Sequence, residues 1–404
     1  MFFDFGFKSS FLLIFFFHGI IFSVLLFIKG LTSGNKSSLW LGAFTLLCSM
    51  YIVPFMLGYA GWYSKPIYRD LLFYIPFQQV LLLPPVLYFY FKTLLDRSFI
   101  FSKKDFLHFS PAALYLSYSI IVVVTDKIIL HEYYFYKDGK DKDLSGWYQV
   151  AGFISLICYL TLSLKNYKKY KTITYNTLSF ADSVMFKWAQ RFLIAFLLLL
   201  AIRLLFFILN PEWDEFGRKF WYYVSFSILY YYISISGYTN SLRSAASFSD
   251  LPPNADATLE LKINSTNEPE EKLFAFNNIE RVGEKVEIPD LLLWKEKIET
   301  LMLSDRLFEN PELTIADLCG QLGTHPKKIS QAINQGFDMN FNDFVNHYRI
   351  RAVIKKIEDG EHELQTLISI AFECGFNSKS TFNRAFKRYT SSTPKEYIKK
   401  YNDK

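Results

Sequence analysis

The sequence predicts an all-helical protein in three parts: a seven-helix transmembrane bundle, a flexible linker, and a soluble helical domain with two helix-turn-helix units. Three observations lead to this fold class. Hydrophobic residues make up 51% of the 404 residues and aromatic residues 19%, and long apolar runs fill residues 1–240. Ser, Asn, Pro, Asp and Glu dominate residues 241–288. Apolar residues then recur at helical spacing over residues 289–404.

Seven apolar segments in the first part have about the length of a membrane-spanning helix. A tilted helix needs about 17–25 residues to cross a bilayer. Lys8 is the sole basic residue ahead of the first segment, and no small-residue cleavage site follows it, so we expect this segment to be retained as a span. The predicted spans are at about 11–29, 38–60, 70–92, 107–125, 147–164, 188–209 and 219–239.

The third segment contains three prolines and two glutamines. Pro76 and the pair Pro84-Pro85 predict a kink, which a helix bundle can accommodate. Gln78 and Gln79 are expected to hydrogen-bond between helices rather than to bind a ligand.

Two further polar residues lie inside predicted spans. Arg203 is a candidate functional residue because an arginine within a membrane is costly. The simpler interpretation is that it pairs with a polar group or extends to the membrane surface, and we favour it. His18 is expected to be a hydrogen-bonded residue of the bundle.

Basic residues are divided unevenly between the two sides of the predicted bundle. With seven spans, a cytoplasmic C-terminus places the N-terminus outside. The loops around 30–37, 93–106 and 165–187 then face the cytoplasm, and together they carry more Lys and Arg than the outer loops. This excess favours a multi-pass protein of the inner (cytoplasmic) membrane with its C-terminal domain in the cytoplasm.

The linker at 241–288 has too few apolar residues to form a core of its own, so we expect it to be flexible. Its Asn264-Ser265-Thr266 triplet fits the N-glycosylation pattern, but on this topology the segment is cytoplasmic.

The soluble part carries none of the patterns typical of an enzyme. The four cysteines lie far apart and form no CxxC pair or Cys/His cluster. Phosphate-binding loops and Ser/His/Asp arrangements are also absent from its sequence. We therefore predict no catalytic residues, no cofactor and no metal site.

The last part begins with an apolar-faced helix near Pro289, which could pair as a short heptad or, more simply, pack onto the domain. A first helix-turn-helix follows over 313–335. Thr314 and Asp317 form a capping-box pattern, Gly323 ends the first helix, and Pro326 suits the first turn of the second. This spacing leaves polar residues on the outer face of the second helix.

A long amphipathic helix is predicted over 341–357, and the helix-turn-helix pattern then recurs over 366–390. Thr366 can cap its first helix and Gly375 makes the turn. Three phenylalanines are expected in the core: Phe376, Phe382 and Phe386.

Residues 313–400 resemble the DNA-binding domain of the AraC/XylS family of transcription regulators. The matching runs are L-T-I-x-D-L at 313–318, I-S-x-x-I-N at 329–334, F-x-x-F-V-N-x-x-R at 341–349, I-A-x-x-x-G-F at 370–376, S-x-F-x-R-x-F-K at 380–387 and T-P-x-x-Y at 393–397. The resemblance covers about a quarter of the chain. It implies two helix-turn-helix units joined by a central helix, with both recognition helices in successive major grooves. The family often has Gly where Ser391 stands and a small N-cap where His325 stands.

This resemblance implies a set of DNA-binding residues. By position, Lys379, Thr381 and Arg384 would contact bases, and Lys387 and Arg388 the phosphate backbone. Basic residues are concentrated in 378–404, whereas 289–377 is net acidic, so phosphate binding is expected to be strongest at the second unit. The full predicted set is Lys327, Lys328, Gln331, Asn334, Lys379, Thr381, Asn383, Arg384, Lys387 and Arg388.

The leading hypothesis is a membrane-anchored, one-component transcription regulator that senses a signal through its spans. Its expected partners are double-stranded DNA and the lipid bilayer, with a homodimer and RNA polymerase as further candidates and the signal ligand unknown. Two alternatives are a transporter or channel with a helical regulatory tail, and a membrane anchor with a DNA-silent tail. Duplex binding by the C-terminal domain distinguishes them.

Overall fold

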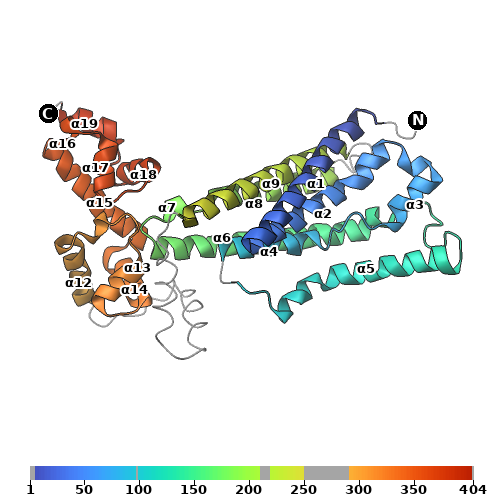
Figure 1. The fold of residues 1–404 in the computed structure, drawn as a ribbon, viewed down its shortest axis with the longest axis horizontal. Helices are drawn as coiled ribbons and strands as arrows, with labels where there is room; N and C mark the ends of the chain where they lie inside the picture. The colour runs from blue at the N-terminus through green and yellow to red at the C-terminus, as the bar shows by residue number, and fades with distance from the viewer. Residues whose placement is uncertain (1–4, 97–98, 210–218, 250–290, 403–404) are drawn as a thin grey trace. The chain divides into compact units, whose positions relative to one another are not determined.

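The computed structural model describes residues 5–96, 99–209, 219–249 and 291–402, shown in colour in Figure 1. Most of the described residues are helical, and the β-type pairing among them is an isolated bridge between Leu178 and Thr314. The all-helical prediction is thereby confirmed for this part of the chain. The chain divides into two compact units: residues 1–168 with 187–259, and residues 169–186 with 260–404.

In the first unit, α1 (Phe7–Ser33) and α2 (Lys36–Tyr59) pack together as a helical hairpin. Gly34 turns the chain in the left-handed region, with φ 65°, and the Asn35 side chain caps α2 by accepting from the Ser37 amide. The Ser23 hydroxyl donates to the Gly42 carbonyl at 2.9 Å. His18 Nε2 lies 2.8 Å from Ser234 Oγ, as expected for a hydrogen-bonded residue of the bundle.

The third predicted span is interrupted. The expectation of one kinked helix over 70–92 is wrong: α3 (Pro66–Tyr74) and α4 (Leu83–Leu95) are separated by non-helical backbone at 75–82. Pro84 and Pro85 open α4, where a missing amide hydrogen costs no helical bond. The pattern of prolines therefore produces a break with a new helix start.

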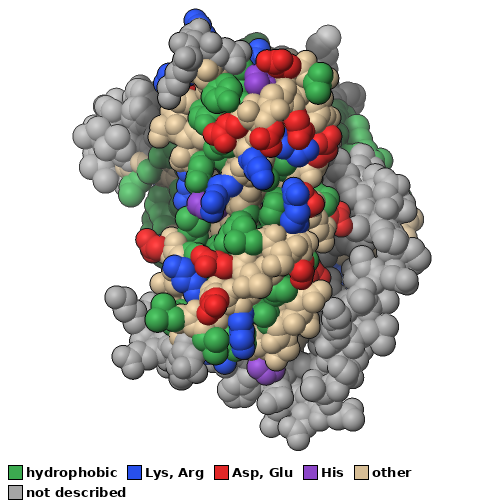
Figure 2. Space-filling view, turned by 90° about the vertical axis from the view of Figure 1, so that its left-hand side faces the viewer, with side chains coloured by type: hydrophobic (Ala, Val, Ile, Leu, Met, Phe, Trp, Pro, Cys, Tyr) green, Lys and Arg blue, Asp and Glu red, His purple; other side chains and the backbone are tan. Residues whose placement is uncertain are grey.

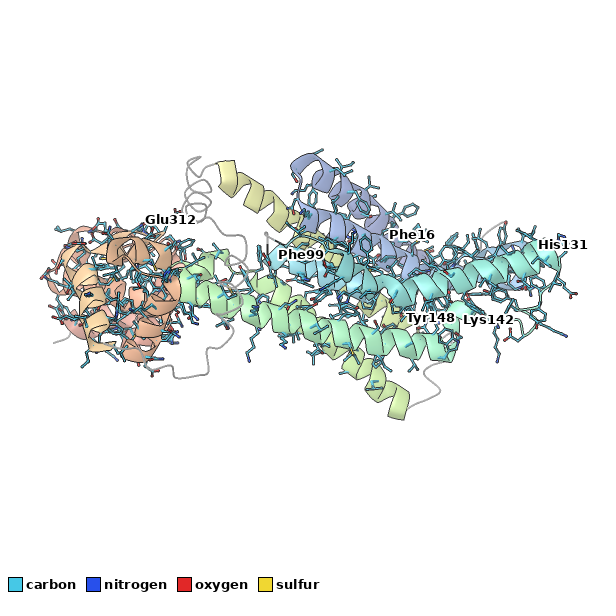
Figure 3. All side chains as sticks on the ribbon, turned by 90° about the horizontal axis from the view of Figure 1, so that it is seen from below. Phe16, Phe99, His131, Lys142, Tyr148 and Glu312 are labelled. Atoms are coloured by element: carbon cyan, nitrogen blue, oxygen red, sulfur yellow. The ribbon has the colours of Figure 1, made fainter. Side chains whose placement is uncertain are left out.

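Contacts from distant segments stabilise this break. The Gln78 amide donates to Asp143 Oδ2 at 2.9 Å, and Tyr148 Oη donates to the Gln78 carbonyl at 2.9 Å. The Gln78 side chain donates to the Tyr51 carbonyl at 3.0 Å. Tyr148 lies near the start of α6, close to Lys142 (Figure 3). Gln78 thus joins several elements, as expected for a polar residue within a bundle.

The next helices differ from the predicted spans mainly in length. A continuous helical stretch over Lys103–Ile129 contains α5 (Ser110–Val123), preceded by a 3-10 turn and followed by a π turn. α6 (Gly146–Thr177) extends well past the predicted end at 164, through a stretch rich in Lys, Tyr and Thr. Its last residues, from Lys169, belong to the second unit.

α8 (Lys187–Leu209) and α9 (Phe220–Ser249) are helical where the sixth and seventh spans are predicted. α9 continues into the first residues of the predicted linker, 241–249. The rest of that linker, including Asn264, and the Arg203 side chain lie outside the described residues. Among the described residues, four helices are long and apolar enough to cross a membrane: Phe7–Ser33, Lys36–Tyr59, Lys103–Ile129 and Gly146–Thr177. The count of seven spans stays a prediction.

The second unit contains the C-terminal helices and the short helix α7 (Ala181–Val184) (Figure 1). Its remaining helices are α12 (Leu291–Ser304), α13 (Ile315–Leu322), α14 (Pro326–Phe337), α15 (Phe341–Glu358), α16 (Glu361–Leu364), α17 (Leu367–Glu373), α18 (Lys379–Thr390) and α19 (Pro394–Asn402). Two hydrophobic clusters form its core, one around α12–α14 and one around α17–α19. Both pack against α15, and Ala352 contacts each of them.

Candidate nucleic-acid interface

The first helix-turn-helix unit forms as its local sequence signals predict. The Thr314 hydroxyl accepts from the Asp317 amide while the Asp317 carboxylate accepts from the Thr314 amide at 2.8 Å, which completes a capping box at the start of α13. Gly323 ends α13 with φ 60°, and Pro326 occupies the first turn of α14. Ile329 and Ile333 are fully buried, so the polar face of α14 is fixed by the core.

α12 restricts part of that polar face. Lys327 is exposed, but Lys328 Nζ lies 4.3 Å from the centre of the Trp294 ring on α12, and its side chain is half-buried. Such a cation–π contact holds the ammonium group against the domain. Gln331 and Asn334 are partly exposed. α12 therefore packs onto the domain, as predicted, and leaves Lys327 as the exposed cation of this set in the first unit.

The second helix-turn-helix unit has a tighter turn than the first. Gly375 has φ 90°, and a Cβ placed there would lie 2.3 Å from the Phe308 carbonyl oxygen and 2.9 Å from the Glu309 backbone. No other residue fits this position without moving that backbone. Ser378 then caps α18, because its hydroxyl accepts from the Thr381 amide at 3.2 Å.

Two phenylalanines determine which face of α18 packs against the core. Phe382 and Phe386 are buried and pack edge-on to one another, and Phe382 also contacts Phe376. All three are core residues, as predicted. The side chains left exposed on the opposite face are Lys379, Asn383, Arg384, Lys387 and Arg388.

One predicted base-contacting residue does not lie on that face. Thr381 is 4% exposed, and its hydroxyl accepts from the Ser378 hydroxyl at 2.8 Å. A base contact needs an exposed side chain, and Thr381 is buried because its position at the third residue of α18 places it under the Ser378 cap. Arg388 is exposed but donates to Asp343 Oδ1 at 2.5 Å, and Arg384 forms an ion pair with Asp182.

The central helix α15 holds a buried charge, Arg349, which belongs to the matching run at 341–349 but was given no role by the sequence analysis. Arg349 is 1% exposed, and its Nε donates to the Phe308 carbonyl at 2.8 Å. Its Nη2 donates to the Asn310 carbonyl at 2.7 Å, and its guanidinium lies 5.8 Å from the centre of the Phe376 ring. Burial lowers the pKa of Arg349 to about 9. Arg349 thus joins the chain ahead of the first unit to the turn of the second.

Asn342 and Asn346 are also buried and precede Arg349 by seven and three residues on the same helix. The Asn346 side chain donates to Asn342 Oδ1 at 3.1 Å. Their spacing along the sequence could have indicated that Asn342, Asn346 and Arg349 lie together, since these positions share one face of a helix. Residue type alone would not predict their burial, because polar residues are ordinarily assigned to the exposed face.

Comparison with known proteins agrees with this geometry. Residues 318–400 match the family described as "Helix-turn-helix domain". The chain is 30% identical over 123 residues to the TCP pilus virulence regulatory protein of Vibrio cholerae serotype O1. The aligned region covers 30% of this chain and 42% of that relative. It is 27% identical over 106 residues to an uncharacterized HTH-type transcriptional regulator of Staphylococcus aureus, covering 26% of this chain and 14% of that protein.

The C-terminal region is an AraC-type helix-turn-helix domain. The chain spans less than half the length of the curated relatives that it matches. The family match lies in its C-terminal part. No solved structure gives a significant match to the chain.

Charge on the AraC-type domain is mixed in sign. Figure 2 shows one face of this unit, on which Lys and Arg side chains are interspersed with Asp and Glu. The exposed cations of α18 are therefore distinguished by clustering on one short helix rather than by a uniformly basic domain. Among the residues that the structure describes, no group of three or more His, Cys, Asp or Glu side chains could hold a metal ion.

Proposed function

We propose that this chain is a membrane-anchored, one-component, sequence-specific DNA-binding transcription regulator that couples a signal at the membrane to gene expression. The observation that carries the proposal is the combination, in one chain, of an AraC-type helix-turn-helix domain and four helices able to cross a bilayer. The names of its relatives, a virulence regulatory protein and HTH-type transcriptional regulators, support a regulator rather than an enzyme.

In the proposed topology the membrane domain crosses the inner membrane seven times. α8, α9 and the interrupted third segment, in which α3 and α4 together would make one crossing, would add three crossings to the four helices that meet the length and apolarity criteria. An odd number of crossings places the N-terminus outside when the AraC-type domain is in the cytoplasm, where DNA is accessible. The domain at 1–240 would then be the sensory part.

In the proposed DNA complex, α14 and α18 enter successive major grooves. We propose that Lys379, Asn383 and Arg384 contact base edges and that Lys387 and Arg388 contact phosphates, a proposal supported by the exposure of all five side chains. Thr381 is buried and serves the start of α18 instead.

Duplex binding by the full-length protein in detergent, measured over a salt series, tests the DNA-binding part of the proposal. Lys387→Ala combined with Arg388→Ala should weaken binding at least about tenfold and lower the salt slope by about 2, since each lost phosphate contact removes about one released counterion. Lys103→Ala with Lys104→Ala removes two exposed cations from the membrane domain and is the matched control. Equal effects of both pairs, or no duplex binding at low salt, would contradict the proposal.

A reporter fused after residue 240 tests the topology. A reporter active only in the cytoplasm should be active in this fusion, and one active only outside the inner membrane should be silent. The reverse pattern would place the AraC-type domain away from DNA and overturn the proposal, whatever the duplex-binding result.

A further inference from the structure

A short stretch between the predicted fifth and sixth spans packs onto the AraC-type domain. We call residues 178–183 the docking segment. Residues 169–186 form one compact unit with the C-terminal domain, although they lie more than a hundred residues ahead of it in the chain. Figure 1 shows α7, which contains the second half of this segment, beside the C-terminal helices. The docking segment contacts the first helix-turn-helix unit, the central helix α15 and the second helix-turn-helix unit.

The first contact is made by the backbone. Leu178 and Thr314 form an antiparallel bridge, and the Ser179 amide donates to the Leu313 carbonyl at 3.1 Å. Leu313 and Thr314 immediately precede α13. The docking segment therefore pairs, as a strand would, with the residues that open the first unit.

The second contact completes the hydrogen bonding of Arg349. A guanidinium has five N–H donors. Phe308 and Asn310 carbonyls accept two of these bonds, and Asn346 Oδ1 lies 3.4 Å from Nη1. Ser179 supplies the other acceptors: its hydroxyl oxygen lies 3.1 Å from Nη2 and its carbonyl oxygen 3.4 Å from Nη1. Without the docking segment, a nearly inaccessible cation would lose two of its five acceptors.

Asn342 strengthens the same contact. It is 1% exposed, and its side-chain amide donates to the Ser179 carbonyl at 2.7 Å. Unsatisfied polar groups are costly to bury. The polar face of α15 formed by Asn342, Asn346 and Arg349 is therefore matched to a peptide backbone, and Ser179 supplies that backbone.

The third contact reaches the predicted DNA-reading helix. Asp182 forms an ion pair with Arg384 of α18, and the Asp182 side chain is 3% exposed. Tyr175 Oη donates to the other carboxylate oxygen of Asp182 at 2.7 Å, so the carboxylate is held in place by its own segment. Next to it, the Asn377 side chain donates to Ser183 Oγ at 3.4 Å. Asp182 thus presents a negative charge to Arg384, as a DNA phosphate or base acceptor would.

We propose that the docking segment is an intramolecular ligand of the AraC-type domain, and that it competes with DNA for Arg384. Its release frees the recognition face of α18, so the loop between the fifth and sixth spans transmits the state of the membrane domain to DNA binding. The docking itself is independent of the proposed function, whereas the competition with DNA rests on it. Two measurements separate them.

Docking is measured by cross-linking in the full-length protein. Ser183→Cys and Asn377→Cys are introduced together with Cys158→Ser, because Cys158 is the exposed cysteine of the natural chain and the other three are buried. A short bifunctional thiol reagent should join the two new cysteines, and Asp182→Asn should lower the yield. A matched variant, Glu312→Gln, removes an exposed carboxylate of the same unit and should not. Absence of the cross-link in folded protein overturns the proposal.

Competition is measured by duplex binding of the same proteins at low salt, with a pool of random-sequence duplexes as the probe. Asp182→Asn should bind about tenfold more tightly than the unchanged protein, within the usual range of coupling between two sites. Glu312→Gln should change affinity less than about twofold, which corrects for the loss of one negative charge.

The cross-linked protein should bind duplex weakly, and excess duplex should protect the two cysteines from cross-linking. Equal binding by Asp182→Asn and Glu312→Gln, or undiminished binding by the cross-linked protein, would refute the competition. Efficient cross-linking with no duplex binding by any variant would instead refute the proposed function and the competition together, and leave the docking established.

Discussion

The two helix-turn-helix units share one architecture but differ in three respects. The turn of the first contains Gly323, around which a Cβ would meet no atom within 4 Å, whereas Gly375 in the second lies against the backbone of residues 308 and 309. The second helix of the first unit begins at His325 without a side-chain cap, and that of the second unit begins with a capping serine. The third difference is charge, which is concentrated on the second unit.

The repeated pattern therefore carries two different surfaces. The first unit packs against α12, which holds Lys328 over Trp294. The second unit presents a short, capped and basic helix, and the docking segment contacts it there. We infer that the first unit contributes mainly a stable platform, and that the second unit is where binding is controlled. Three matched pairs of substitutions test the difference between the two units.

The largest difference is expected between the two turn glycines. Gly375→Ala should destabilise the domain by about 2–5 kcal/mol, because a left-handed alanine costs about 1–2 kcal/mol and the collision with the residue 308–309 backbone adds about 1–3 kcal/mol. Gly323→Ala has the same backbone cost without the collision, partly offset by a less flexible unfolded chain, and should cost about 1 kcal/mol.

Hydrogen exchange of the full-length protein measures both effects within their own units. Amides of α17 and α18 should lose protection in Gly375→Ala far more than amides of α13 and α14 do in Gly323→Ala. Equal losses would show that the backbone around residue 308 yields to the new methyl group, and that the two turns are equivalent.

The helix caps form the second pair. Ser378→Ala removes the acceptor for the Thr381 amide and should cost about 1 kcal/mol. His325 already has the extended backbone of a cap, with φ −91° and ψ 147°, so His325→Ser should stabilise the first unit by about 0.5–1 kcal/mol.

Thermal unfolding of the two single variants and of the double variant measures these changes. The double variant should lie close to the starting protein, since the two sites belong to separate units and their effects should add. A serine at 325 that gives no gain would mean that the exposed His325 side chain stabilises α14 in another way.

The sequence predicted the C-terminal domain closely because local and long-range requirements agree there. Thr314, Gly323 and Pro326 signal helix ends within a few residues, and the buried faces follow the helical period. Thr381 departs from the prediction because the third residue of a helix lies beneath its N-cap, so a polar side chain there bonds inward. The DNA contacts themselves stay predictions.

Elsewhere the deciding contacts are remote in sequence. Whether Pro76 kinks a helix or ends it depends on partners for the freed backbone groups, and Gln78 finds these in Tyr148 and Asp143. The docking of Ser179 on Arg349 joins residues 170 positions apart. Periodicity describes a single element, so it cannot show which distant backbone satisfies a buried arginine.

The smallest expected difference lies at the ends of the two second helices. Asp338 after α14 and Ser391 after α18 both adopt left-handed conformations, with φ 54° and 58°. Ser391→Gly should stabilise the second unit by about 0.5 kcal/mol, because relief of about 1–2 kcal/mol of backbone strain exceeds the added flexibility of the unfolded chain. Asp338→Gly should give less, because aspartate tolerates this conformation better than serine does. Chemical denaturation of both variants measures the difference, and a larger gain at 338 would show that the first unit, and not the second, carries the greater strain.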